Sequence, residues 1–188
     1  MLEQVNALTV EYAMLPQGGT VLCAVSGGAD SVCLLHLLRE RARQTGTRGF
    51  ALIAAHYDHQ LRGEFSTGDR VFVENLCKMW TIPLYLGSGD VAGEAARRGK
   101  GIEETAREMR YAFLEKTAEE VGADVIATAH NADDNAETLL LHLVRGTGLQ
   151  GLTGIPPRRE KLVRPLLTTT RGEILAYLEE HGLSWRED

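Results

Sequence analysis

The chain has 188 residues, 44% of them hydrophobic, and a formal net charge of −6. This length suits one domain with a sizeable core, and the composition excludes a disordered chain. The net negative charge provides no chain-wide basic surface for nucleic acid. No apolar run approaches the ~20 residues of a membrane span. The first 15 residues lack the Lys or Arg of a secretory signal, so we expect neither a membrane segment nor secretion.

The three cysteines, Cys23, Cys33 and Cys77, include no Cys-x-x-Cys pair. Cys23 and Cys33 lie in apolar runs, where a free thiol behaves as a small hydrophobic side chain. This usage predicts buried thiols in a reducing cytoplasm rather than disulfides or a cysteine zinc site.

We expect an N-terminal helix over residues 2–15. It is followed by a strand, a glycine-containing turn and a second helix. Residues 20–23 predict a buried strand and 32–44 a helix, and between them lies Ala24-Val25-Ser26-Gly27-Gly28-Ala29-Asp30-Ser31. Glycines let backbone N–H groups approach a ligand, and the first turn of a helix presents unpaired N–H groups. The turn is therefore a candidate phosphate loop. The alternative is a turn in which Ser31 or Asp30 simply caps the helix.

The rest of the chain alternates strands with helices. We expect helices over residues 67–80, 102–121, 134–144 and 170–181, strands over 50–55, 82–86 and 124–129, a loop over 87–101 and an extended segment over 161–167. Continuously apolar strands are typical of a parallel sheet covered on both faces. The pattern predicts one α/β domain, a three-layer, mainly parallel sheet with helices on both faces.

Polar clusters follow the second and fourth predicted strands, where functional residues of open α/β sheets gather. The first cluster is His56-Tyr57-Asp58-His59, which we expect to orient a ligand rather than to bind zinc. The second contains His130, Asp133, Asp134 and Glu137. Its carboxylates can hold Mg²⁺ or a cationic substrate, or simply cap the helix that follows.

Three arginines are further candidates. Arg107 and Arg110 lie one turn apart on a predicted helix, as on a surface that forms salt bridges. Arg145 precedes Gly146, and an arginine beside glycines can clamp phosphate charge.

The turn lacks the Lys of a Walker loop and has too few glycines for the dinucleotide-binding turn. Ser26-Gly-Gly-Ala-Asp-Ser31 instead resembles the pyrophosphate (PP) loop of the N-type ATP pyrophosphatases, which cleave ATP between the α and β phosphates. Further motifs are similar to those of the tRNA(Ile)-lysidine synthase family. They lie at residues 56–63, 106–111, 128–138, 145–149, 163–167 and 185–188.

This resemblance implies a Rossmann-like fold of the adenine nucleotide alpha hydrolase type and a two-step reaction. ATP adenylates the wobble cytidine of an isoleucine tRNA with a CAU anticodon, and free L-lysine then displaces AMP from C2 to give lysidine. The whole chain would be the catalytic domain without the family's tRNA-binding region, so we expect it to bind ATP but to bind tRNA weakly. A homodimer is left open.

The resemblance also implies roles for individual residues. Asp30 and Asp134 would hold Mg²⁺, and His130 would act as a base or position lysine. Arg107 and Arg110 would contact the phosphates or the cytidine, and Asp133, Asp134 and Glu137 would bind lysine or metal. The residues expected to contact ATP are Ala24, Ser26, Gly27, Gly28, Ala29, Asp30, Ser31, His56, Arg145 and Gly146.

Three other functions were weighed. A tRNA 2-thiolase of the same superfamily commonly uses paired cysteines, which are missing here. An amidating ligase of the GMP synthetase type should lack the motif at residues 56–63. A nucleotide-binding regulatory module with an inactive site is disfavoured, because Asp30, Asp133, Asp134 and Glu137 are all intact.

Overall fold

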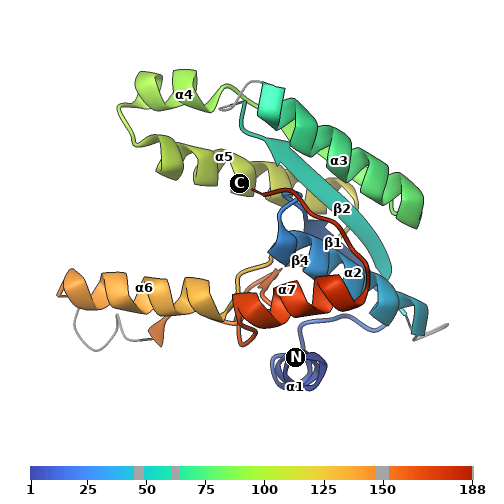
Figure 1. Cartoon of the computed structure of the whole chain (residues 1–188). Coiled ribbons are helices and arrows are strands. Elements are labelled where there is room, and N and C mark those ends of the chain that lie inside the picture. Colours follow the sequence, from blue (N-terminus) through green and yellow to red (C-terminus); the bar gives the residue numbers. More distant parts are fainter. Residues whose placement is uncertain (45–48, 61–63, 147–152, 188) are drawn as a thin grey trace.

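The computed structural model describes residues 1–44, 49–60, 64–146 and 153–187 (Figure 1). Within these residues six strands form one sheet in the order β3-β2-β1-β4-β6-β5, parallel except for β5 against β6. The strands are β1 (Thr20–Ala24), β2 (Ala51–Asp58), β3 (Leu84–Ser88), β4 (Val125–Ala127), β5 (Arg158–Arg159) and β6 (Leu162–Val163). From β1 the chain first builds outward through β2 and β3, and then returns to β4 on the other side of β1.

Helices cover both faces of this sheet. They are α1 (Leu2–Glu11), α2 (Ala29–Gln44), α3 (Glu64–Trp80), α4 (Val91–Arg98), α5 (Ile102–Glu120), α6 (Ala132–Val144) and α7 (Arg171–Glu180). One core contains buried side chains of α1, α2, α3 and α7, and the second contains those of α5. In Figure 1, α7 lies across α2, whereas α6 extends away from the sheet. None of the helices in the described part of the chain could span a bilayer.

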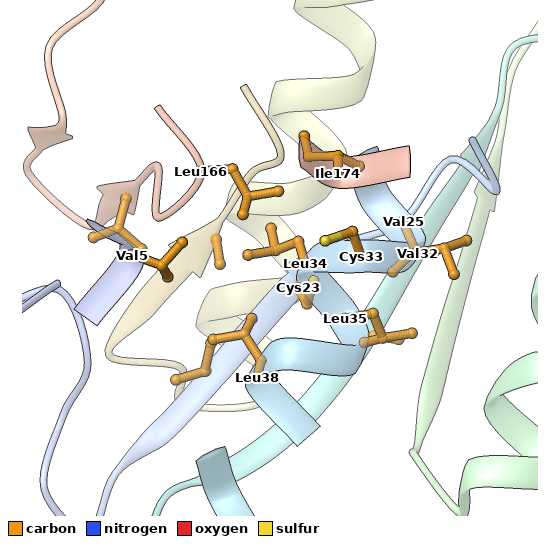
Figure 2. Close-up of a cluster of buried hydrophobic side chains, with 14 of the residues drawn as sticks. Val5, Cys23, Val25, Val32, Cys33, Leu34, Leu35, Leu38, Leu166 and Ile174 are labelled. Atoms are coloured by element: carbon orange, nitrogen blue, oxygen red, sulfur yellow. The ribbon is translucent and has the colours of Figure 1, made fainter. Parts of the chain in front are cut away.

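Successive side chains of the central strands enter opposite cores. Val21 and Cys23 of β1 lie in the first core, whereas Leu22, between them, lies in the second. Figure 2 shows the first core, where Leu34 and Leu38 of α2 lie among side chains from other elements, including Val5 and Ile174. Since both faces of β1 are buried, its sequence is continuously apolar. The predicted three-layer α/β fold with a mainly parallel sheet is confirmed.

The prediction of a loop over residues 87–101 was wrong, because β3 continues to Ser88 and α4 follows. The Asp90 carboxylate caps α4 by accepting a hydrogen bond from the Gly93 N–H at 2.9 Å, and Val91 is fully buried. Gly99 ends the helix in the left-handed conformation, at φ +65°. Gly99, which we interpreted as a loop residue, thus ends a short helix.

Two other expectations were corrected. The strand expected over residues 50–55 continues to Asp58, so His56, Tyr57 and Asp58 lie inside β2 rather than after it. The helix predicted over 67–80 begins earlier, at Glu64, and its buried face includes Leu76. Val71 and Met79 are 48% and 70% exposed, while Val73 and Cys77 are buried.

Candidate functional site

A pocket of about 1050 Å³ opens at the carboxyl ends of β1, β2 and β4. The chain runs from β1 to β2 on one side and reaches β4 on the other, so this edge is the topological switch point of the sheet. The pocket is lined by the loop after β1, the end of β2, the segment after β4, and parts of α5, α7 and the C-terminal residues. Residues predicted from separate motifs therefore meet in one place.

Ser31 organises the loop after β1. Its hydroxyl oxygen accepts hydrogen bonds from the backbone N–H groups of Ser26 (3.2 Å) and Gly27 (3.1 Å) and donates to the Gly28 carbonyl at 2.9 Å. The Gly28 N–H donates to the Ser26 hydroxyl at 3.3 Å. The three consecutive N–H groups are thus paired within the loop, and they fix its shape beside the first turn of α2, whose N-terminus is suited to an anion.

Gly27 has a backbone conformation that favours glycine, at φ +103°. Its carbonyl accepts a hydrogen bond from the Arg186 N–H at 2.9 Å, and Arg186 also pairs with Asp69 of α3 at 3.0 Å. The C-terminal residues 185–187 line the pocket beside this loop. The loop is therefore held on one side by its own serines and on the other by the end of the chain.

Asp30, in the first turn of α2, has one engaged and one unengaged carboxylate oxygen. Oδ2 pairs with Arg171 Nη1 at 2.5 Å, whereas Oδ1 is buried without a hydrogen-bond partner. The N-terminal position on α2 favours a negative charge. Asp30 lines the pocket, and its unpartnered carboxylate oxygen is well suited to a cation.

His56 is 4% exposed and its ring orientation is fixed. Nδ1 lies 2.8 Å from the Val25 carbonyl, which can only accept, so Nδ1 carries the proton. Nε2 is then an acceptor, and it has no partner although it is buried. The imidazole can therefore accept a hydrogen bond from a hydroxyl or amino group of a ligand in the pocket.

His130, after β4, lies at the pocket wall with Nδ1 3.0 Å from the Thr128 hydroxyl. Burial, and then the positive charges of Arg164, Arg107 and Arg110, lower the pKa of His130 to about 4. A pKa this low keeps the imidazole neutral at pH 7 and makes it a weak base, so His130 is better suited to position a reacting group by a hydrogen bond than to take up its proton.

This pKa predicts a loss of stability in acid. Between pH 6.5 and about 4 the unfolded chain binds a proton that the folded His130 does not, so the free energy of unfolding decreases as pH falls. The effect between pH 7 and 5 is at most about 2 kcal/mol. We expect His130→Gln to lose correspondingly less stability than the parent over this interval in urea unfolding. Equal losses would contradict the assignment, and unfolding at pH 8.5 corrects for any change in packing.

The carboxylates at the start of α6 have structural partners. Asp134 and the N-cap residue Asn131 exchange hydrogen bonds of 2.9 Å between their side chains and backbones. Asp133 accepts a 2.7 Å bond from the Arg171 N–H. Asp134 lines the pocket, whereas Asp133 and Glu137 are exposed and outside its lining. The capping alternative thus accounts for part of this cluster, but each capping carboxylate keeps a second oxygen.

The predicted arginines are placed differently from one another. Arg110 lines the pocket, and its guanidinium and that of Arg107 lie 5.5 and 5.0 Å from the centre of the Tyr111 ring. Burial lowers the pKa of Arg110, whereas Arg107 is exposed, so the solvated surface that we predicted is present at Arg107 but not at Arg110. Arg145 and Gly146 follow the far end of α6, about 20 Å along the helix from Ala132, and do not line the pocket. Residues 61–63 and 147–149 of the predicted motifs lie outside the described residues.

Only some of the predicted residues in the loop after β1 line the pocket. Ala24, Ser26, Gly28, Asp30 and Ser31 line the pocket, whereas Gly27 and Ala29 support it from behind. Within the described residues no group of three His, Cys, Asp or Glu side chains could form a metal site on its own. A magnesium ion that also binds substrate phosphates needs only one or two protein carboxylates, a requirement that Asp30 meets.

Sequence reasoning missed Arg171 and underestimated the last residues. Arg164 and Arg171 are not among the predicted site residues, yet Arg171 pairs with Asp30, and Arg164 is 4% exposed. Arg164 donates to the Pro156 carbonyl at 2.6 Å. The capping pattern of Thr170 and Glu173 was visible, and it places the residue after Thr170 at the start of a helix, but the sequence does not show what that helix start faces.

Comparisons with known proteins agree with this geometry. A family model described as a PP-loop domain matches residues 2–188. A protein from Thermotoga sp. (strain RQ2) named tRNA(Ile)-lysidine synthase is 45% identical over 175 residues, which cover 93% of this chain and 41% of the relative. One of the same name from Bacteroides thetaiotaomicron is 43% identical over 190 residues, covering 100% and 43%. The chain therefore spans less than half the length of these relatives.

Solved structures show a similar fold. The U34-tRNA thiolase NcsA from Methanococcus maripaludis, solved with its 4Fe–4S cluster, superposes with a TM-score of 0.78 at 19% identity, covering 98% of this chain and 65% of that one. An NH3-dependent NAD synthetase from Campylobacter jejuni gives 0.61 at 14%, covering 96% and 71%. At these identities the likeness shows the fold alone.

Proposed function

Because the chain belongs to the PP-loop domain family, we propose that it is the catalytic domain of a tRNA(Ile)-lysidine synthase. It uses ATP to attach lysine to C2 of the wobble cytidine of an isoleucine tRNA with a CAU anticodon. One observation carries this proposal. Ser26, Gly28 and Ser31 of the loop, the carboxylate of Asp30 and the neutral His130 line a single pocket, in a chain 45% identical to a relative of that name.

In the first step the loop holds the triphosphate. The N-terminus of α2 and the hydroxyl groups of Ser26 and Ser31, which line the pocket, stabilise the negative charge that develops on pyrophosphate. The cytidine O2 forms a bond to the α phosphorus, and the bond to the β phosphate breaks as pyrophosphate leaves. Mg²⁺ held by Asp30, with Asp134 as a second candidate ligand, would neutralise part of this charge. His56 accepts a hydrogen bond from the nucleoside part of ATP.

In the second step an amine of lysine attacks C2, and AMP leaves with the electrons of the C2–O bond. The attacking amine must lose a proton, which passes to solvent, while the neutral imidazole of His130 positions the amine by a hydrogen bond. Asp134 lines the pocket and keeps one carboxylate oxygen for a lysine ammonium group. Asp133 and Glu137 lie outside the lining, so they would contact a substrate that extends beyond it.

A 2-thiolase is the alternative closest in fold, and the cysteines disfavour it. All three described thiols are free and buried, and they lie in the hydrophobic core rather than in the pocket lining. Burial raises the pKa of Cys33 to about 12 and that of Cys77 to about 11, and it raises that of Cys23 as well. Such thiols are poor nucleophiles and poor cluster ligands. Free thiols are typical of the reducing cytoplasm, where we propose that the enzyme is located.

The test uses the protein in its full natural length with ATP, labelled L-lysine and an isoleucine tRNA transcript carrying CAU. We expect one pyrophosphate and one AMP per lysine incorporated, and no incorporation when the transcript carries U at the wobble position. Pyrophosphate and AMP release in the same ratio without lysine would remove lysine from the proposal. A homodimer stays a prediction, which light scattering of the purified protein checks.

A further inference from the structure

We propose that Arg171 is an exchangeable counter-ion of the pocket, which pairs with Asp30 in the structure described here and moves to the polyphosphate of bound ATP. The inference rests on the proposed function, because it requires a polyphosphate beside the loop. It adds a phosphate-binding residue that none of the motifs in the sequence contains.

The backbone of Arg171 is fixed while its side chain is not. Its N–H donates to the Asp133 carboxylate at 2.7 Å, and the carbonyl of Thr169, two residues earlier, accepts from the Ala132 N–H at 2.9 Å. These bonds join the starts of α6 and α7 at the pocket. The guanidinium, in contrast, contacts Asp30 through Nη1, and its side chain is 46% exposed. Movement of this group therefore requires only side-chain rotation.

The pair with Asp30 is easily exchanged. An ion pair with this exposure contributes little to stability, and it leaves Asp30 Oδ1 without a partner. A triphosphate carries more negative charge than one carboxylate and can accept two parallel guanidinium N–H bonds. A cation that binds Asp30 would also repel the guanidinium. Both effects displace Arg171 from Asp30 toward the phosphates.

A purely structural role for Arg171 predicts something different. If the pair with Asp30 only tied α7 to α2, its loss would loosen the whole pocket and weaken every ligand alike. An exchangeable counter-ion instead affects two ligands in opposite directions. Its removal weakens binding of a polyphosphate, which loses a partner, and strengthens binding of a cation alone, which loses a competitor.

The experiment measures three affinities of Arg171→Gln. For the magnesium complex of α,β-methylene ATP we expect a 10- to 100-fold loss, and for AMP a change below twofold. For Mn²⁺ alone, followed by electron paramagnetic resonance, we expect a gain of several-fold. Arg171→Lys should lie between parent and Gln for the ATP analogue, because it keeps the charge without the paired donors. Arg97→Gln, which removes an exposed arginine of α4 paired with Glu94, should change none of the three.

Each other outcome overturns a defined claim. Parallel losses for the ATP analogue and AMP would make Arg171 structural, and unchanged affinity for the analogue would remove it from phosphate binding. If the parent chain fails to bind the analogue at all, the proposed function fails and the inference fails with it.

Discussion

Asp30→Asn is expected to reduce pyrophosphate release by roughly 10³-fold or more, the range found when a group that stabilises transition-state charge is removed. The substitution keeps the size of the side chain but removes its charge, and with it the pair with Arg171 and the unpartnered anionic oxygen. Without that carboxylate, the Mg²⁺ that Asp30 would hold loses a ligand, and the charge that builds up on the leaving pyrophosphate is opposed by the N-terminus of α2 and by arginines. Release of pyrophosphate from ATP in the presence of tRNA and lysine measures the loss.

The fold should survive this substitution. Asp30 contributes through the dipole of α2 and a partly exposed ion pair, which together amount to about 1 kcal/mol. Asp90→Asn is the matched control, since it removes one carboxylate from the start of α4, outside the pocket, and asparagine also caps helices well. Turnover within tenfold of the parent for a folded Asp30→Asn variant would remove Asp30 from the charge-stabilising role.

Acidic residues and the positive ends of helices lie together at the pocket. The starts of α2, α6 and α7 all meet the pocket or its edge, through Asp30, Asp134 and Arg171. The positive ends of α2 and α6 stabilise the carboxylates of Asp30 and Asp134, and together with that of α7 they favour an anion in the pocket. Such a site can hold a triphosphate and still keep acidic groups for cations. A Walker-type loop differs, because the side chain of its lysine contacts the phosphates directly.

The sequence was sufficient for the sheet, for the loop after β1 and for its neighbours in the pocket. Continuous apolar strands reveal burial on both faces, and parallel strands bring their carboxyl ends to one edge, so Asp30, His56 and His130 could be predicted to meet. These inferences depend only on local pattern and on the geometry of parallel sheets.

Other features depend on contacts between distant segments, which local pattern does not contain. Arg145 beside Gly146 looked like a phosphate clamp, but α6 extends away from the sheet (Figure 1), and both residues follow its far end, outside the pocket lining. Arg171 looked like surface charge because its partner, Asp30, is 141 positions away in the sequence. The role of Arg186 against Gly27 likewise appears only when the chain end returns to the loop.

Gly27→Ala is expected to destabilise the fold by about 1–3 kcal/mol, the range for a residue other than glycine held in a sparsely populated backbone conformation. The space itself is sufficient, because an added Cβ would lie 3.5 Å from Phe72 and from Val73. The strain comes from φ +103°, and relief of that strain would rotate the Gly27 N–H away from Ser31 and its carbonyl away from Arg186. We therefore expect affinity for an ATP analogue to fall at least ~10-fold as well, since both sides of the loop would be released.

Gly172→Ala is the matched control because it predicts the opposite sign. Gly172 lies in α7 with nothing within 4 Å of an added Cβ and with an ordinary φ, so alanine should stabilise the chain by about 0.5–1 kcal/mol. Urea unfolding of the two variants beside the parent separates the general effect of losing a glycine from the effect of its conformation. A Gly27→Ala variant as stable as the parent would mean that the loop adopts a second backbone conformation without loss. Retained nucleotide affinity in that variant would show in addition that the N–H groups of this loop need not be paired as they are here for phosphate to bind.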